Sequence, residues 1–227
     1  CQSLETIEIP SSVESIDEYA FYECTSLRYF EIPQSVKSIG KYAFSGCSSL
    51  TSIEIPSLKS IEMHTFSKCK SLKTIKISSS VTSIDSFAFS ECSSLVSIKI
   101  PSSVTSIGSD SFSGCESLEK VELPSSIESI GSSAFLKCYS LISIEIPPPV
   151  QKINENTFFN CSSLTSIVLP STVKSIESSA FSSCKSLAKI EIPSSVTSIG
   201  SSAFILCSSL ISINIPESVE SIGESAF

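Results

Sequence analysis

The chain has 227 residues, of which 41% are hydrophobic and 17% are charged, and its formal net charge at pH 7 is −8. This much apolar material is enough for a sizeable core and argues against a disordered chain. The acidic balance makes nucleic acid a poor partner, because an acidic surface repels phosphate groups. No apolar run reaches about 18 residues, so we expect no membrane insertion by this segment.

A repeat of 23 residues runs through the whole sequence. Cysteine marks it and recurs every 23 residues, apart from one interval of 22. The ten cysteines are Cys1, Cys24, Cys47, Cys69, Cys92, Cys115, Cys138, Cys161, Cys184 and Cys207. A fixed period of this length predicts a stacked repeat architecture. We therefore expect residues 1–227 to form one continuous array of about ten repeats, truncated at both ends because each end falls inside a repeat.

Each repeat begins with a predicted short strand. In the repeat that starts at Cys184, residues 186–192 (SLAKIEI) alternate apolar and polar side chains over their second half, which is typical of a strand with one buried face. Proline follows at Pro193, and it occupies this position in every repeat except the fourth, which has Ser78. Proline cannot donate a hydrogen bond to a neighbouring strand, so it ends the strand.

Two further elements complete the predicted coil. An apolar pair such as Val104 and Ile107 indicates a second short strand, and the Ala-Phe pair before the next cysteine indicates a single helical or 3-10 turn with Phe pointing inward. One coil cannot bury its own Leu, Ile, Val and Phe, so successive coils must stack around a shared core. The predicted fold is a solenoid with a parallel β-sheet on one face, short strands and single turns on the other, and an internal phenylalanine column from Phe21 to Phe227.

The segment from Ile100 to Cys115 (IPSSVTSIGSDSFSGC) resembles the 23-residue leucine-rich repeat of the BspA-like (Treponema pallidum type) proteins. The resemblance covers the whole chain, and its serine-rich form is similar to the sets in parasitic protists such as Trichomonas and Entamoeba. It implies a leucine-rich repeat solenoid that is a non-enzymatic module of the cell surface or extracellular space, adhering to host matrix or cells. The alternative is an intracellular, cytoplasmic scaffold for protein–protein interactions, which reduced cysteines would suit.

No motif for catalysis, metal binding or cofactor binding stands out. The one histidine, His64, lies at a variable position of its repeat, so no serine or cysteine has a predicted general base. Zinc sites need closely spaced ligands such as C-x-x-C, and none occurs. The cysteines are better interpreted as buried, reduced thiols that fill the core. The sequence thus predicts no enzyme, no metal and no cofactor.

The first candidate binding surface is the outer face of the predicted sheet. Its charged column contains Glu8, Glu31, Glu54, Lys76, Lys99, Glu122 and Glu145, and Tyr29 lies in the adjacent column. Like charges on neighbouring coils repel one another, and a partner of complementary charge would relieve that repulsion. A face that is merely solvated is the alternative.

The second candidate surface is a column two residues before each core phenylalanine. It reads Tyr19, Tyr42, His64 and Phe87, and polar residues follow in the later repeats. These rings either stack on one another and stiffen that end of the array or form an exposed interaction patch. We expect a protein or glycan ligand, such as one from the host extracellular matrix, to contact one of the two columns.

Overall fold

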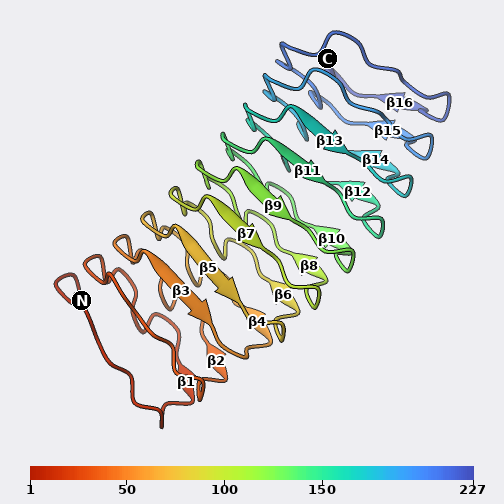
Figure 1. The fold of residues 1–227 in the computed structure, drawn as a ribbon. Coiled ribbons are helices and arrows are strands. Elements are labelled where there is room, and N and C mark those ends of the chain that lie inside the picture. The colour runs from red at the N-terminus through yellow and green to blue at the C-terminus, as the bar shows by residue number, and fades with distance from the viewer.

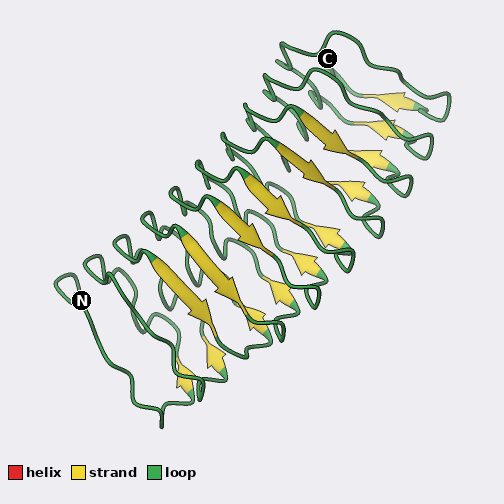
Figure 2. Ribbon diagram, in the orientation of Figure 1, coloured by secondary structure: helices red, strands yellow, loops and turns green.

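A computed structural model describes all residues from 1 to 227 as a stack of coils that follow one another along a single axis (Figure 1). The two ends of the chain lie at opposite ends of the stack. Every regular element is a short strand, and the chain contains no helix (Figure 2). The predicted solenoid of parallel strands is confirmed.

Six coils have a first strand, and these strands lie on one side of the stack, which we call the strand face. Its members are β3 (Ser52–Ile55), β5 (Thr74–Ile77), β7 (Ser97–Lys99), β9 (Lys120–Glu122), β11 (Ser143–Glu145) and β13 (Ser166–Val168). All pairs are parallel: β3 pairs with β5, and β7, β9, β11 and β13 form a second group. Residues 6–9 and 29–32, which occupy the same place in the first two coils, form no strand.

The second strands are two residues long and line another side of the coils. They are β1 (Ser15–Ile16), β2 (Ser38–Ile39), β4 (Ser60–Ile61), β6 (Ser83–Ile84), β8 (Ser106–Ile107), β10 (Ser129–Ile130), β12 (Lys152–Ile153), β14 (Ser175–Ile176), β15 (Ser198–Ile199) and β16 (Ser221–Ile222). They pair in register, serine beside serine and isoleucine beside isoleucine, except that Lys152 faces Ser175. This second sheet is interrupted twice, between β2 and β4 and between β10 and β12.

Both interruptions fall where a coil with glycine at one position is followed by a coil that has another residue at the equivalent position. Gly40 is succeeded by Glu62 in this way, and Gly131 by Asn154. Glycine permits a close approach here, since a Cβ added to Gly131 would lie 2.4 Å from the backbone nitrogen of Ser109. The glycine N–H groups donate to the preceding coil, whereas the N–H groups of Glu62 and Asn154 donate to no backbone acceptor.

The predicted helical or 3-10 turn before each cysteine is wrong. In a 3-10 helix every successive N–H donates three residues back, but here only alternate groups do, as in the bond from Ser45 N–H to the Tyr42 carbonyl. The intervening N–H of Phe44 donates instead to the carbonyl of Thr65 in the next coil, at 2.9 Å. Tyr42 also has φ of 59°, which is outside the helical region. The segment is therefore a series of β-turns that ties adjacent coils together.

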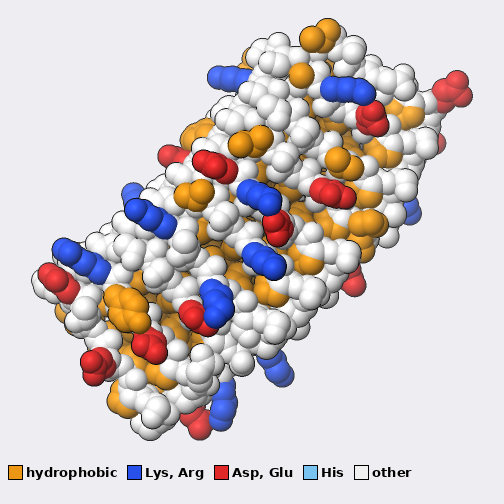
Figure 3. Space-filling view, in the orientation of Figure 1, with side chains coloured by type: hydrophobic (Ala, Val, Ile, Leu, Met, Phe, Trp, Pro, Cys, Tyr) orange, Lys and Arg blue, Asp and Glu red, His pale blue; other side chains and the backbone are white.

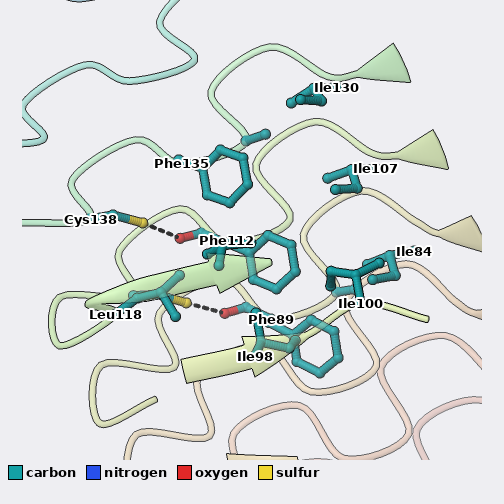
Figure 4. Close-up of a cluster of buried hydrophobic side chains, with 14 of the residues drawn as sticks. Ile84, Phe89, Ile98, Ile100, Ile107, Phe112, Leu118, Ile130, Phe135 and Cys138 are labelled. Carbon is teal, nitrogen blue, oxygen red and sulfur yellow. Dashed lines mark hydrogen bonds between the residues drawn. The ribbon is translucent and has the colours of Figure 1, made fainter. Parts of the chain in front are cut away.

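The phenylalanine column predicted for the core is confirmed. The rings from Phe44 to Phe181 are fully buried, and the centroids of successive rings from Phe21 to Phe227 lie 5.2–5.6 Å apart. Every thiol from Cys47 to Cys207 donates to a phenylalanine carbonyl of an earlier coil, as Cys138 Sγ does to Phe112 at 3.3 Å (Figure 4). Every cysteine except Cys1 is buried as a free thiol, as the sequence predicted.

Candidate functional site: the strand face and the aromatic ladder

The strand face displays the charged column that the sequence predicted. Along β3, Ile53 and Ile55 are buried in the core and Glu54 points outward, because side chains alternate along a strand. The register places Glu54 beside Lys76, Lys99 beside Glu122 and Glu145 beside Val168. Figure 3 shows this face, with acidic and basic side chains dispersed along it and apolar side chains visible between them.

Ion pairs within this face offset much of the expected repulsion. Lys76 Nζ lies 2.7 Å from Glu54 Oε1, and Lys120 Nζ lies 2.6 Å from Glu122 Oε1. The hydrogen bond and charge of Lys120, together with the charge of Lys99, lower the pKa of Glu122. All these side chains are more than half exposed, so the pairs contribute little to stability. They do, however, leave Glu54 and Glu122 with little unbalanced charge.

Two neighbouring carboxylates at the N-terminal end of the face lack such a partner. Glu8 and Glu31 have no lysine or arginine within ion-pair distance, and Glu145 further along is unpaired as well. The hydroxyl of Tyr29 donates to Glu31 Oε2 at 3.4 Å, and Tyr29 is 58% exposed. An aromatic ring and a carboxylate therefore lie together, both open to solvent.

Two depressions hollow the strand face around these residues, and we call them the strand-face hollows. One, of about 690 Å³, is bordered by Ile7, Glu8, Tyr29, Glu31 and Gln34. The other, of about 470 Å³, is bordered by Tyr29, Glu31, Glu54 and Lys76, over Ile53 and Ile75. Tyr29, Glu31 and Gln34 line both hollows, so these residues form the ridge between them.

The hollows coincide with missing strand pairing. No backbone hydrogen bond joins residues 29–32 to residues 6–9 or to residues 52–55, although the bonds at Arg28 and Thr51 hold the coils together just before. Phe30 replaces the usual isoleucine at this level, and its ring packs edge-on against Phe21 and Phe44, with centroids 4.7 and 4.8 Å away. Backbone N–H and carbonyl groups of 29–32 are thus left without partners in the protein.

The second predicted column forms an ordered stack, which we call the aromatic ladder. Ring centroids are 4.9 Å apart for Tyr19 and Tyr42, and 4.5 Å apart for both Tyr42–His64 and His64–Phe87, with interplanar angles of 8–13°. All four residues have φ between 57° and 61°, a region that non-glycine residues seldom adopt. The later members of the column adopt the same φ, so the turn, and not the ring, imposes it.

The rings of this column stack on one another, which is one of the two arrangements predicted for it. The inner faces of the rings cover one another, which leaves their edges and the outer face of Tyr19 to solvent. Tyr19 is 50% exposed and contacts Tyr22 edge-on at 5.5 Å. Partial burial, and secondarily the charge of Lys68, lower the pKa of His64. A role in binding remains a proposal for these residues.

The two sets of residues are not brought together. The ladder belongs to the turn after the second strand, whereas Tyr29, Glu31, Glu54, Lys76, Lys99, Glu122 and Glu145 lie on or beside the first strand. No group of three or more His, Cys, Asp or Glu side chains is placed to hold a metal ion. The fold has no helix that is long and apolar enough to cross a membrane.

Sequence reasoning placed the columns but missed the hollows. Ile7, Glu8 and Gln34 line the larger hollow. Of these, the sequence indicated only Glu8, as a member of the charged column. The replacement of isoleucine by Phe30 was the one available signal. A substitution in the core does not by itself show that the strands above it are unpaired.

Comparisons with known proteins agree with this architecture. The profile described as "BspA type Leucine rich repeat region (6 copies)" matches residues 1–119, 59–161 and 129–227. A leucine-rich repeat protein from Bacteroides ovatus is 32% identical, with a TM-score of 0.76, over 100% of this chain and 70% of that one. A leucine rich cell surface protein from Faecalibacterium prausnitzii is 29% identical, with a TM-score of 0.55, over 95% of this chain and 78% of that one.

A third solved structure, the Treponema pallidum leucine rich repeat protein, is 30% identical with a TM-score of 0.50, over 89% of this chain and 76% of that one. None of the curated proteins matches the chain. The similarity is thus carried by structures of bacterial leucine-rich repeat proteins.

Proposed function

Because this chain belongs to the BspA-type leucine-rich repeat family, we propose that it is a non-enzymatic recognition module of the cell surface that binds a host protein through its strand face. Solenoids of this family type are interaction scaffolds, and their repeated core leaves the outward side chains free to vary. The proposal treats residues 1–227 as one continuous array. We further propose that its serine-rich repeats are of the form found in parasitic protists, which is the basis for proposing a host ligand.

The observation that carries the proposal is the separation of a repeated core from a varied face. The inward residues of β7, β9 and β11 are Ile98, Val121 and Ile144, all buried. The outward residues at the next position are Lys99, Glu122 and Glu145. Changing the inward set would disturb packing, whereas the outward set can encode a partner without cost to the fold.

A protein ligand fits this face better than a glycan. Sugars bind well against the open faces of aromatic rings, but the ladder rings at Tyr42, His64 and Phe87 cover one another. On the strand face only Tyr29 offers an exposed ring, among charged and polar side chains. A protein surface can match dispersed charges spread over several coils.

The cell surface is proposed because the Faecalibacterium prausnitzii relative is described as a cell surface protein. The second candidate is an intracellular scaffold for a cytoplasmic partner. The buried free thiols favour it, because cytosolic proteins keep their cysteines reduced. Burial also protects these thiols from oxidants, so the same observation is compatible with the surface.

The test is surface plasmon resonance of the array against a panel of extracellular-matrix proteins, a panel of cytosolic proteins and a glycan array. We expect binding to a matrix protein that is lost in the variant Tyr29→Ser/Glu31→Lys. The matched ladder variant Tyr19→Ser/Tyr42→Ser should bind as the parent does. The proposal fails if no matrix protein binds, or if the ladder variant loses binding while the strand-face variant keeps it.

A further inference from the structure

We infer that the strand-face hollows receive an extended segment of a protein partner that presents an arginine or lysine side chain between Glu8 and Glu31. This inference rests on the proposed function and names the chemistry of the partner at that same face. The unpaired carboxylates and the exposed ring of Tyr29, which border the same hollows, support it.

The unpaired carboxylates of the strand face indicate a positively charged partner. Glu54 and Glu122 already have lysine partners at 2.7 and 2.6 Å, whereas Glu8 and Glu31 have none and lie on adjacent coils. Both carboxylates line the larger hollow, so one guanidinium or ammonium group placed in it can approach both. The acidic net charge of −8 reinforces attraction of a basic segment.

The ridge between the hollows favours the same partner. Tyr29 is exposed on one side of Glu31, and its hydroxyl donates to Glu31 Oε2. A cation placed here would contact the ring and the carboxylate together, a combination that suits arginine in particular. Because Tyr29 and Glu31 are already hydrogen-bonded, less side-chain freedom is lost when a cation binds.

The length of the hollows limits the segment to a few residues. Together they extend over the first four coils, from Ile7 to Lys76. Three steps of about 4.8 Å give about 14 Å, which about four residues of an extended chain would span. A segment on this path crosses residues 29–32 nearly at right angles, so it can make single hydrogen bonds to their unpaired backbone groups but does not pair with them as a strand.

Other occupants fit less well. A phosphate-bearing ligand would be repelled by Glu8 and Glu31, and an acidic peptide would meet the same carboxylates. An apolar segment would leave both carboxylates without partners at the rim. Glu145 provides an internal comparison, because it is an unpaired carboxylate on the same face that lines neither hollow.

The test uses the full chain and three blocked pentapeptides, Ac-Thr-Val-Arg-Val-Thr-NH₂ and its versions with citrulline or glutamate in the central position. Citrulline keeps the shape of arginine but removes its charge. Binding is followed by ¹⁵N NMR. We expect the arginine peptide to shift the amides of residues 29–32 and to bind at least about tenfold more tightly than the other two.

Matched variants distinguish a built site from general attraction to an acidic protein. Glu8→Gln/Glu31→Gln should weaken binding of the arginine peptide at least about tenfold, and Glu145→Gln should leave it unchanged. Equal losses in the two variants, or equal binding of the arginine and citrulline peptides, would overturn the inference. If a matrix protein binds the array but its affinity survives Glu8→Gln/Glu31→Gln, the inference fails and the proposed function stands. If the arginine peptide binds as expected but no matrix protein binds the array, the inference stands and the proposed function fails.

Discussion

The side chain of Asn154 donates a hydrogen bond from Nδ2 to the carbonyl oxygen of Ile130 at 2.6 Å. In other coils the equivalent carbonyl accepts a hydrogen bond from a backbone N–H, as the Ile107 carbonyl does from Gly131. Asparagine thus replaces the main-chain donor at the point where β10 and β12 do not pair. The other interruption, at Glu62, lies four coils earlier, and both coils carry a threonine whose hydroxyl bonds three residues back, Thr65 to Glu62 and Thr157 to Asn154.

Removing this amide should destabilise the array. We expect Asn154→Ala to lower the free energy of unfolding by about 1–3 kcal/mol, because the carbonyl of Ile130 loses its donor. Urea denaturation measures the change. Gln151→Ala, at an exposed side chain nearby, is the control and should change stability by less than about 0.5 kcal/mol. Equal stability of the two variants would show that water satisfies the carbonyl equally well.

A cavity in the phenylalanine column should cost more. Phe112 is fully buried, and its ring lies 5.5 Å from the rings of Phe89 and Phe135. We expect Phe112→Ala to lower the unfolding free energy by about 3–5 kcal/mol, because coils fixed on both sides cannot collapse into the space. Val168→Ala, at a side chain that is 59% exposed, is the control. A loss below about 1 kcal/mol in Phe112→Ala would contradict a shared core.

The aromatic ladder should contribute to stability through stacking. Tyr42→Ser removes two ring contacts, with Tyr19 at 4.9 Å and His64 at 4.5 Å. Serine occupies the same left-handed turn position in later coils, so the backbone should tolerate the change. We expect a loss of about 1–3 kcal/mol in urea denaturation. Tyr29→Ser is the matched control, since that ring stacks on no other ring, and an equal loss there would argue against a stacking role.

The buried thiols should resist alkylation in the folded state. Burial raises the pKa of Cys47 and Cys92 to about 12, and the thiolate is the reactive form. With iodoacetamide at pH 8, we expect only the exposed Cys1 to react within minutes and all ten cysteines to react in urea. Mass spectrometry counts the labels. Several labels on the native protein would contradict the buried column of thiols.

The same raised pKa values predict a loss of stability in alkali. An unfolded cysteine ionises near pH 9, the unperturbed value, whereas the folded thiols of Cys47 and Cys92 stay neutral until about 12. Stability is therefore complete below pH 9 and falls as pH rises toward 12, by up to about 1.4 kcal/mol per pH unit for each buried thiol. Urea midpoints at pH 8, 9 and 10 test this, with Cys92→Ala expected to reduce the slope. A flat profile would contradict it.

The sequence contains most of the fold because each feature of the coil has a local cause. Proline ends the first strand, and the apolar pattern fixes which side of each strand is buried, so the shared phenylalanine column follows from the period alone. The turn before cysteine was the exception. A short segment ending in Ala-Phe suits a helical turn, and only the stacked neighbour, which accepts the N–H of Phe44, favours β-turns instead.

The candidate site was less predictable than the fold. The column from Glu31 to Glu145 could be read from the repeat, because alternation determines which side chains point outward. The ion pair of Lys120 with Glu122 within one strand could not, since it depends on side-chain conformation. The hollows beside Tyr29 lie where strand pairing between coils is missing, which no pattern within a single repeat records.

The β-turn bonds between coils also determine how the molecule would respond to force. A pull on the two ends acts along the stack, so it loads each layer of bonds, such as Phe44 to Thr65, in series. Once one coil has detached, the next has a neighbour on one side only, so detachment should proceed coil by coil. Each detachment releases about 80 Å of chain for 23 residues. In an optical trap the protein should lengthen in small, nearly equal steps, so that a tethered array would act as an extensible spring and not as a rigid rod.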